Sequence, residues 1–437
     1  MSYNAETVPD LLAPGGPLAS EVAGYEDRPF QREMALEVAR LLEDGGPMPI
    51  AAPTGIGKSL GYALPAAAWA LHGHGPVVSS THTKALQDQL VTQEGPRLAR
   101  ILGPLDVALM KGRANYLCRR RYEVALAEAA TEGTQRLLTE LRHWVESTPD
   151  GDISTSGVRH GRDLHFLMTR VGSEARFCAH AACTPASGCF FKLARARAAE
   201  AHLLVVNHAL LAIHLFGGRD LLPSFPALVV DEAHAFVKVA LDHLTVSVNP
   251  ARLAALQEEA PGSRGRVPDV VRFGAGADRA VTLHRALAGL DAAARAYFAA
   301  GNGSKPRADS RRRYKDADDL AALTPAGPGA LFQALAAARA EARALADLVR
   351  REGAGEKREE SCGHELARFQ EALLEFSEDL EQVTEPDPHD RDHVNWKEWP
   401  GDGTFGLYRA PLEPGPRLAA SLREDPERLV FTSATLA

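Results

Sequence analysis

The chain has 437 residues, enough for two or three domains with a sizeable buried core. Apolar residues make up 45% of it and charged residues 24%, a balance that excludes global disorder. The formal net charge of −8 excludes a histone-like polycation, so any surface for nucleic acid has to be a local patch. No apolar run is long enough to span a membrane, and five cysteines without a secretory signal favour a reducing, cytoplasmic setting.

Short apolar runs alternate with helical patterns along much of the chain. Residues 1–26 are rich in Pro, Gly and small residues and are expected to form a flexible lead-in. The runs that predict strands are Met48–Ala52, Val77–Ser80, Val107–Met110, Leu203–Val206, Leu228–Val230 and Leu429–Thr432. Such runs are typical of parallel strands that helices cover on both faces, so the predicted fold class is α/β with a parallel sheet.

Two segments interrupt this alternation. The first, residues 111–200, contains most of the cysteines and more basic than acidic residues. The second, residues 246–389, lacks strand signals and has a helical Ala/Leu/Arg/Glu pattern, within which Lys305–Lys315 is expected to be an exposed basic loop. The sheet domain is therefore predicted to consist of residues 27–110, 201–245 and 390–437.

A phosphate-binding loop is indicated by residues 52–59, Ala-Pro-Thr-Gly-Ile-Gly-Lys-Ser, between a predicted strand and a predicted helix. Glycines here let backbone N–H groups point at phosphates beside the positive end of the helix. The Lys58 ammonium can reach the β- and γ-phosphates, and the Ser59 hydroxyl can bind Mg²⁺. The candidate nucleotide contacts are Thr54, Gly55, Gly57, Lys58 and Ser59. The alternative is a chance Gly/Lys turn, and Ala52 replaces the usual first glycine.

A second motif, Asp231-Glu232-Ala233-His234, follows the predicted strand Leu228–Val230. Asp231 would hold Mg²⁺, directly or through water, and Glu232 would orient and deprotonate the attacking water. The alternative is an acidic cap on the next helix. The candidate catalytic residues are Lys58, Asp231, Glu232 and His234, and the two motifs together predict a nucleotide-binding motor fold.

The two motifs and four further segments resemble, in order, the DinG/XPD group of iron–sulfur superfamily-two DNA helicases. The four segments are Arg28–Met34, Ser80–Gln89, Val205–Leu211 and Thr432–Leu436. The resemblance implies a RecA-like motor domain that uses ATP and Mg²⁺, in which Gln31 reads the adenine edge. It also implies DNA contacts and a coupling of the ATP state to the grip on DNA. The DNA contacts would be Thr81, Thr83, Lys84 and Asn207, and the coupling residues Ser433 and Thr435. Helix caps, core polar residues and a strand-end turn are the structural alternatives for these positions.

Four cysteines fall in the first interrupting segment: Cys118, Cys178, Cys183 and Cys189. Four converging thiolates suit zinc as well as an iron–sulfur cluster, and unligated cysteines are a third possibility. The run Lys-Gly-Arg-Ala-Asn-Tyr-Leu-Cys over residues 111–118, before a cysteine triad, resembles the [4Fe–4S] domain of the group. The resemblance thus implies an iron–sulfur domain over residues 111–200 and a helical arch domain over residues 246–389. Lys111 and Arg113 join the candidate contacts for single-stranded DNA.

The implied function is an ATP-dependent 5′-to-3′ DNA helicase of repair or replication, acting as a monomer on single-stranded or forked DNA. The chain ends at Ala437, so the second motor domain is expected to be absent, either lost by truncation or supplied in trans. Little or no unwinding by the chain alone is expected, since an arginine finger contributes about 10³–10⁵ in rate. The alternatives are a non-catalytic DNA-binding iron–sulfur module and an RNA-directed ATPase with the same acidic box. A nuclease–helicase fusion is a poorer fit, because the segment before Arg28 is too short for a nuclease domain.

Overall fold

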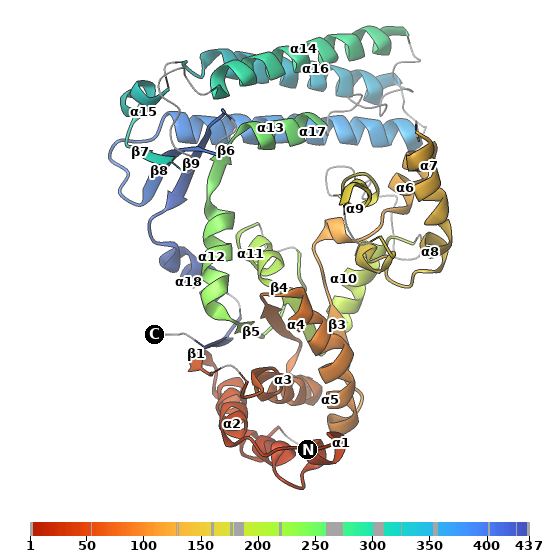
Figure 1. Ribbon diagram of the computed structural model, residues 1–437, viewed down its shortest axis with the longest axis vertical. Helices are drawn as coiled ribbons and strands as arrows, with labels where there is room; N and C mark the ends of the chain where they lie inside the picture. Colours follow the sequence, from red (N-terminus) through yellow and green to blue (C-terminus); the bar gives the residue numbers. More distant parts are fainter. Residues whose placement is uncertain are drawn as a thin grey trace.

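The computed structural model describes residues 3–53, 55–127, 129, 131–158, 161–174, 178, 188–217, 221–258, 274–299, 310–324, 326–352, 357–400, 403–424 and 426–434. Figure 1 shows an elongated molecule, with a sheet domain at its lower end and a layer of long helices at its upper end. A second group of helices, α6 to α10, lies on one side between these two ends. None of the described helices is long and apolar enough to cross a membrane.

A six-stranded parallel sheet forms the centre of the lower domain. Its strands, in spatial order, are β1 (Gly46–Ala51), β10 (Arg428–Ser433), β5 (Ala227–Asp231), β2 (Val77–Thr81), β4 (Leu203–Asn207) and β3 (Val107–Leu109). All five strand pairs are parallel, so every carboxyl end lies at the same edge of the sheet. The predicted α/β class and all six predicted strands are confirmed.

Both faces of this sheet are buried, because the apolar runs supply side chains in both directions. Val77, Val205 and Val229 belong to one hydrophobic core, and Val78, Val206 and Val230 belong to the other. The helices that supply the first core are α2 (Pro29–Asp44), α3 (Lys58–Trp69) with its extension Ala70–His74, and α5 (Gly95–Leu102). The second core includes α10 (Phe190–Glu200), α11 (His208–Phe216), α12 (Ala233–Leu244) and α18 (Pro414–Glu424).

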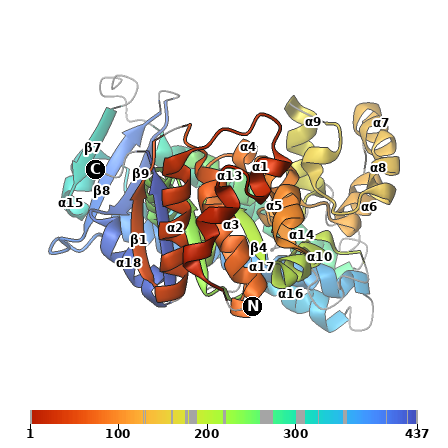
Figure 2. The same ribbon diagram turned by 90° about the horizontal axis from the view of Figure 1, so that it is seen from below.

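The N-terminal segment packs on this domain, contrary to the predicted flexible lead-in of residues 1–26. A short helix over Ala5–Leu12 and α1 (Pro17–Glu21) lie against α2 and α5. The apolar residues Ala5, Val8, Leu12 and Leu18 are buried in the first core. Their helical spacing makes the segment amphipathic, and this outweighs its Pro and Gly content. Figure 2, seen from below, shows α1, α2 and α3 next to one another.

The first insertion leaves the sheet after β3 and returns to it at β4. Its helices and helical turns are Arg113–Asn115, α6 (Arg119–Ala127), α7 (Glu132–Glu140), α8 (Arg142–Ser147), Ile153–Thr155, α9 (Gly161–Phe166), Leu167–Val171 and α10. Backbone hydrogen bonds cross-link its start: Leu117 N–H donates to the Gly151 carbonyl (2.7 Å) and Cys118 N–H to the Val171 carbonyl (2.9 Å). Tyr116, Phe190 and Leu138 lie in the same core as one face of the parallel sheet, so this insertion packs on the parallel-sheet domain.

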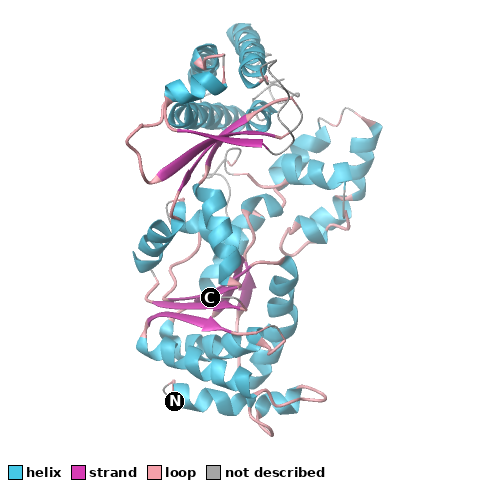
Figure 3. Cartoon of the chain, turned by 60° about the vertical axis from the view of Figure 1, so that its left-hand side comes forward, coloured by secondary structure: helices cyan, strands magenta, loops and turns pink. Residues whose placement is uncertain are grey.

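The second insertion lies between α12 and α18 and combines helices with a second sheet. Its helices are α13 (Pro250–Glu258), α14 (Gly274–Phe298), α15 (Ala317–Leu323), α16 (Gly329–Glu352) and α17 (Lys357–Thr384). Its strands are β6 (Val246–Val248), β7 (Ser310–Tyr314), β8 (His393–Trp399) and β9 (Gly406–Pro411). The strands form an antiparallel sheet in the order β6-β9-β8-β7. Figure 3 shows the long helices on one side of this sheet.

Two predictions for this region were therefore wrong. Ser310–Tyr314 is a strand and not part of an exposed loop, although residues 301–309 are outside the described part. Residues 393–411 pair within the second sheet and not within the parallel sheet, to which the chain returns only at α18 and β10. β7, β8 and β9 alternate polar and apolar side chains and contain several charged residues, so they lack the apolar runs by which the parallel strands were recognised.

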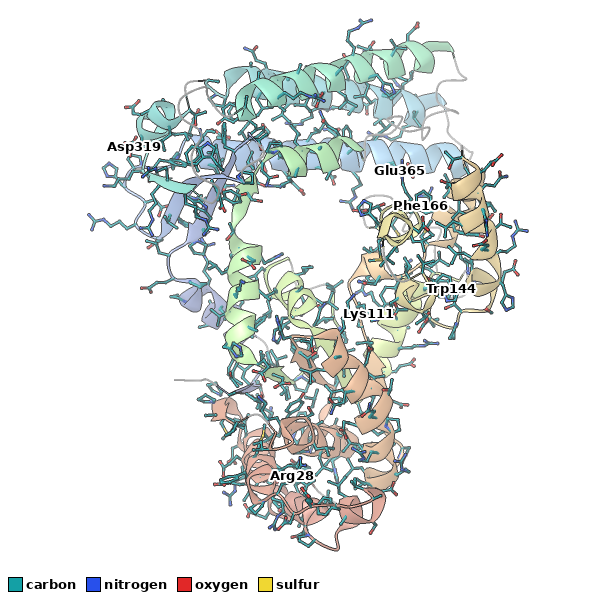
Figure 4. The ribbon with its side chains drawn as sticks, viewed as in Figure 1. Arg28, Lys111, Trp144, Phe166, Asp319 and Glu365 are labelled. Carbon is teal, nitrogen blue, oxygen red and sulfur yellow. The ribbon has the colours of Figure 1, made fainter. Side chains whose placement is uncertain are left out.

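A contact between the two insertions joins residues far apart in the chain. Arg120 of α6 donates to Glu365 of α17 across 3.0 Å, in an ion pair that is partly shielded from solvent. Figure 4 shows Glu365 on α17 beside the segment that carries Phe166, with Lys111 below them. The α6 and α17 helices are thereby held together, while both insertions also contact the lower domain through their own connections.

Candidate nucleotide and nucleic-acid sites

The predicted phosphate loop runs from β1 to the N-terminus of α3. Gly55 and Gly57 have φ angles of +86° and +85°, which an L residue adopts only with strain. A Cβ on Gly57 would also lie 2.1 Å from Gln31 Nε2, so the loop passes directly against α2. Ala52 does not have a positive φ, so its methyl group is accommodated without strain at the strand exit. Thr54 lies outside the described residues.

Asp231 is buried at the carboxyl end of β5 and is held from three sides. Its Oδ1 accepts from Thr432 Oγ1 (2.8 Å) and from the Glu232 backbone N–H (3.0 Å), and its Oδ2 accepts from Tyr62 OH (3.3 Å). Burial raises the pKa of Asp231, while the Thr432 hydrogen bond and the Lys58 charge oppose that rise. A divalent cation at this carboxylate would replace the missing solvation and favour its ionised form.

Glu232 and Lys58 meet at the same edge of the sheet. Lys58 Nζ donates to Glu232 Oε1 across 2.7 Å, and both side chains are partly buried. Glu232 has φ +52° and ψ +52° and is the only non-glycine residue with positive φ in the described part. Strain of this kind is typical of functional positions, because surrounding structure must hold the residue there. The geometry thus brings the phosphate-loop ammonium and both acidic residues to one place.

His234 connects this edge to the neighbouring strand β10. Its Nδ1 lies 2.8 Å from Ser433 Oγ and 3.4 Å from Glu232 Oε2. His234 thus links Ser433 to Glu232, whereas Thr435 lies outside the described residues.

A cavity of about 320 Å³ lies beside the phosphate loop, between the N-terminal segment, α2 and the helical stretch that follows β2. Its lining includes Tyr25, Arg28, Gln31, Ser59, Glu94 and Arg97. Gln31 Nε2 donates to the Gly57 carbonyl (2.7 Å), and Arg28 Nη1 donates to the Gly55 carbonyl (3.4 Å). Figure 4 places Arg28 in the lower part of the molecule, among the helices that surround this cavity. Its position next to Ser59 suits the base and sugar of a nucleotide whose phosphates occupy the loop.

Tyr25, Glu94 and Arg97 line this cavity, although the sequence motifs did not predict them. Tyr25 belongs to the segment that was predicted to be flexible, and its hydroxyl donates to the Leu12 carbonyl. Glu94 is buried and accepts from Arg97 Nη1 (2.6 Å) and Gln89 Nε2 (3.2 Å). Tyr25 lies in the irregular stretch before α2, so no helical periodicity pointed to it. Nothing in the local sequence indicated Glu94 or Arg97.

The candidate DNA contacts after β2 begin a helix. Thr81 ends β2, and Thr83 Oγ1 accepts from the Leu86 N–H (3.3 Å), which caps α4 (Lys84–Gln89). The helix continues through Leu90–Glu94 into α5, so one helical stretch runs from Lys84 to the cavity beside the predicted phosphate loop. Exposed N–H groups and a lysine at a helix start suit a phosphate of the DNA backbone.

Asn207 and His208 lie at the carboxyl end of β4, next to β2. Asn207 is half-buried, and its Oδ1 caps α11 by accepting from the Leu210 N–H (2.7 Å). His208 is buried, with Nδ1 2.7 Å from Ser80 Oγ, and its Nε2 has no hydrogen-bond partner in the described part. Burial and the neighbouring His82 lower the pKa of His208 to about 4, so this imidazole is neutral at pH 7.

Lys111 and Arg113 were predicted to contact single-stranded DNA, and the structure gives both of them protein partners. Lys111 Nζ forms an ion pair with Asp152 and donates to Ser154 Oγ (3.2 Å). The Arg113 guanidinium lies 4.0 Å from the centroid of the Phe191 ring, a cation–π contact. Lys111 is therefore engaged in holding the first insertion together, whereas Arg113 presents a guanidinium on an aromatic face.

Three of the four predicted cluster cysteines are described. Cys118, Cys178 and Cys189 are half-buried free thiols, and Cys183 lies outside the described residues. Within the described part, no group of three or more His, Cys, Asp or Glu side chains is placed to hold a metal ion. Gly188, which precedes Cys189, lies against Arg119, which follows Cys118. A Cβ on Gly188 would lie 3.1 Å from Arg119 Nε. Burial lowers the pKa of Arg121, and nearby Glu174 and Cys118 oppose that shift.

No protein-family model matches the chain. It is 34% identical to the ATP-dependent DNA helicase YoaA of Escherichia coli over 259 residues, which are 57% of this chain and 40% of that protein. It is 37% identical to the ATP-dependent helicase DinG of Mycobacterium tuberculosis over 249 residues, 52% of this chain and 36% of that protein. The chain is thus similar in sequence to the YoaA and DinG helicases. This confirms the resemblance found in the sequence motifs.

A solved structure of an XPD helicase shares 13% of its sequence with the chain, with a TM-score of 0.46 over 95% of this chain and 59% of that one. The chain spans less than half the length of the two relatives named above.

Proposed function

We propose that this chain is the nucleotide- and DNA-binding part of an ATP-dependent DNA helicase. The observation that carries the proposal is the meeting of Lys58, Asp231 and Glu232 at the carboxyl edge of one parallel sheet, beside a cavity for the base. Asp231 and Ser59 would hold Mg²⁺, Lys58 would bind the β- and γ-phosphates, and Glu232 would orient and deprotonate water. The Lys58–Glu232 ion pair has to open before phosphates and water can take these positions.

The nucleic acid in this proposal is single-stranded or forked DNA, and translocation runs 5′ to 3′ in repair or replication. Support comes from the Escherichia coli relative, which is named a DNA helicase, and from the helix start at Thr83 and Lys84. His234 and Ser433, 2.8 Å apart, would transmit the nucleotide state to the strand next to β5. For this chain we propose binding of nucleotide and of DNA, and hydrolysis of ATP.

A test separates the two proposed sites by one substitution in each. Lys58→Ala should weaken binding of a fluorescent ATP analogue about 10- to 100-fold and leave binding of a single-stranded oligonucleotide unchanged. Lys84→Ala should weaken binding of the oligonucleotide and leave binding of the ATP analogue unchanged. Hydrolysis should rise with single-stranded DNA more than with RNA of the same length. The proposal would be contradicted if Lys58→Ala bound the ATP analogue as well as the unsubstituted chain. It would also be contradicted if RNA stimulated ATP hydrolysis more than single-stranded DNA.

We propose in addition that Cys118, Cys178, Cys183 and Cys189 hold a [4Fe–4S] cluster that stiffens the first insertion. The contact between the neighbours of Cys118 and Cys189 supports it, as does Arg121, a cation that suits anionic thiolates. Anaerobically purified protein should be brown and contain about four irons per chain. Cys189→Ser should lose the iron, whereas Cys362→Ser, in α17, should keep it. A colourless protein that contains zinc would contradict this assignment.

A further inference from the structure

One face of the antiparallel sheet lies in a hydrophobic core, and the opposite face carries aromatic, basic and other polar side chains. Val248, Leu407 and Tyr314 are buried in the core that α14, α16 and α17 share. On the opposite face, the strand pairing places Ser247, Tyr408, Trp396 and Arg313 in one row across β6, β9, β8 and β7. Arg311 and Glu398 are paired in the adjacent row, next to Gly406. We call these residues the outer face.

Two aromatic side chains occupy the central strands of the outer face. The Trp396 and Tyr408 rings stack with centroids 5.2 Å apart and an angle of 11° between their planes, and both are half-buried. Gly406 leaves space for Tyr408, because a Cβ there would lie 2.9 Å from the Tyr408 ring and 3.1 Å from Asn249 Cβ. Trp396 Nε1 donates to Glu398 Oε2 (3.1 Å), which fixes the indole. The aromatic pair is therefore preorganised on the sheet.

Basic side chains lie beside this aromatic pair on the edge strand β7. Arg311, Arg312 and Arg313 are all exposed. Arg311 Nε is paired with Glu398 Oε2 at 3.0 Å. Arg313, next to Trp396 in the row, has no carboxylate partner in the described part of the chain. A positive edge beside half-exposed aromatic rings is complementary to a nucleic acid whose bases are unpaired.

We propose that the outer face is a second contact surface for single-stranded DNA, with a base against the Trp396–Tyr408 pair and phosphates at Arg313 and Arg311. The arrangement combines a four-stranded antiparallel sheet, helices on one face and aromatic residues on the two central strands of the other, and such sheets bind unpaired bases by stacking. The surface lies on the second insertion and needs no nucleotide. It rests on the proposed function only in taking DNA as the ligand.

A different role for the same arginines is protection of an edge strand. Charged residues on an exposed edge prevent pairing with another chain, and β7 is such an edge. Edge protection requires charge on β7 irrespective of the face, whereas DNA binding requires Arg313 on the outer face beside Trp396. Arg312 lies between Arg311 and Arg313 in the chain, and its position in the strand places it on the same face of the sheet as Tyr314. Arg312 therefore provides a matched control.

The experiment uses the 437-residue chain without nucleotide and a single-stranded oligonucleotide that contains 5-iododeoxyuridine. Ultraviolet cross-linking followed by peptide mass spectrometry should identify Trp396 or Tyr408, and a duplex of the same length should give no cross-link there. Arg313→Ala should weaken single-strand binding about 3- to 10-fold and reduce its dependence on salt, whereas Arg312→Ala should change it less than about 2-fold. Trp396→Leu should weaken binding about 5- to 10-fold.

Cross-links confined to the parallel-sheet domain or the first insertion would overturn the outer-face proposal and leave the proposed helicase function standing. Equal effects of Arg312→Ala and Arg313→Ala would likewise overturn it, in favour of edge protection. An absence of any single-strand binding would contradict both proposals. The cross-linking experiment uses the unsubstituted chain, so it tests the outer-face proposal even if Trp396→Leu fails to fold.

Discussion

The two sheets of this chain place their polar groups in different parts of the sheet. In the parallel sheet both faces are buried, and the polar side chains gather at the carboxyl ends of β1, β5 and β10. In the antiparallel sheet one face is buried, and polar and aromatic side chains cover the other. A sheet buried on both sides can offer only its edge to a ligand, whereas a sheet solvated on one side can offer a surface.

This difference implies that substitutions in the two sheets affect separate properties. The parallel sheet positions a small site at its edge, and in our proposal the polar residues of that site govern nucleotide binding. The antiparallel sheet depends on its buried face for stability and on its outer face for contacts. Changes to one sheet should leave the property of the other unaltered.

The largest effect is expected from Leu407→Ala, in the buried face of the antiparallel sheet. Leu407 is fully buried, and truncation of such a leucine lowers stability by about 2–5 kcal/mol. Hydrogen exchange should show faster exchange of the amides of β8 and β9. Binding of an ATP analogue should be unchanged, and a loss of that binding would show that the two sheets are not independent.

Lys58→Ala should have the next largest effect. Unlike Leu407→Ala, it should change nucleotide binding and leave stability unaltered. Loss of a charged contact to phosphate should weaken binding of Mg²⁺–ATP about 10- to 100-fold. Titration with a fluorescent ATP analogue measures the affinity, and thermal unfolding without nucleotide should differ little from that of the unsubstituted chain. An unchanged affinity would remove the phosphate-loop assignment.

A smaller effect, on the free energy of unfolding, is expected from the titration of Lys397, which is buried in the antiparallel sheet. Its Nζ donates to the Leu323 carbonyl (2.7 Å) and to Thr324 Oγ1 (2.9 Å) and lies 3.8 Å from the Phe405 ring centroid. Burial lowers the pKa of Lys397 from 10.5 to about 8. Between these values the unfolded chain binds more protons, so the free energy of unfolding should rise with pH from about 8 to 10.5.

Lys397→Met should remove that rise. Denaturant unfolding at pH 8 and at pH 9 should show a difference of about 1 kcal/mol between the two pH values for the unsubstituted chain, and less for the variant. The same pH dependence in both proteins would assign the rise to another group.

The smallest effect is expected from Glu232→Gln in the parallel sheet. This change removes the ion pair that holds Lys58 before nucleotide binds, so the affinity for Mg²⁺–ATP should rise about 3- to 5-fold while hydrolysis falls. Asp231→Asn is the comparison, because Asp231 is held by Thr432 and Tyr62 and its loss should weaken Mg²⁺-dependent binding. Weaker binding by Glu232→Gln would show that the ion pair does not compete with nucleotide.

Much of the parallel sheet and its site could be predicted from the sequence. Each of its strands is an apolar run, and Lys58, Asp231 and Glu232 belong to compact motifs whose chemistry depends on neighbours in the chain. The N-terminal segment and the antiparallel sheet could not be predicted in this way. Tyr25 and Glu94 line one cavity from two separate segments, and β8 pairs with β7 across a long helical stretch.

The sequence by itself determined the α/β class, the order of the motifs and the relationship to the DinG and YoaA helicases, because these depend on local patterns and on identity along the chain. Only the tertiary structure decided that Lys58 is paired with Glu232, that Lys111 is paired with Asp152 and that Trp396 stacks on Tyr408. These contacts join residues on different segments, and the packing of whole elements brings them together. Local sequence carries no information on which distant side chain a charge or a ring will meet.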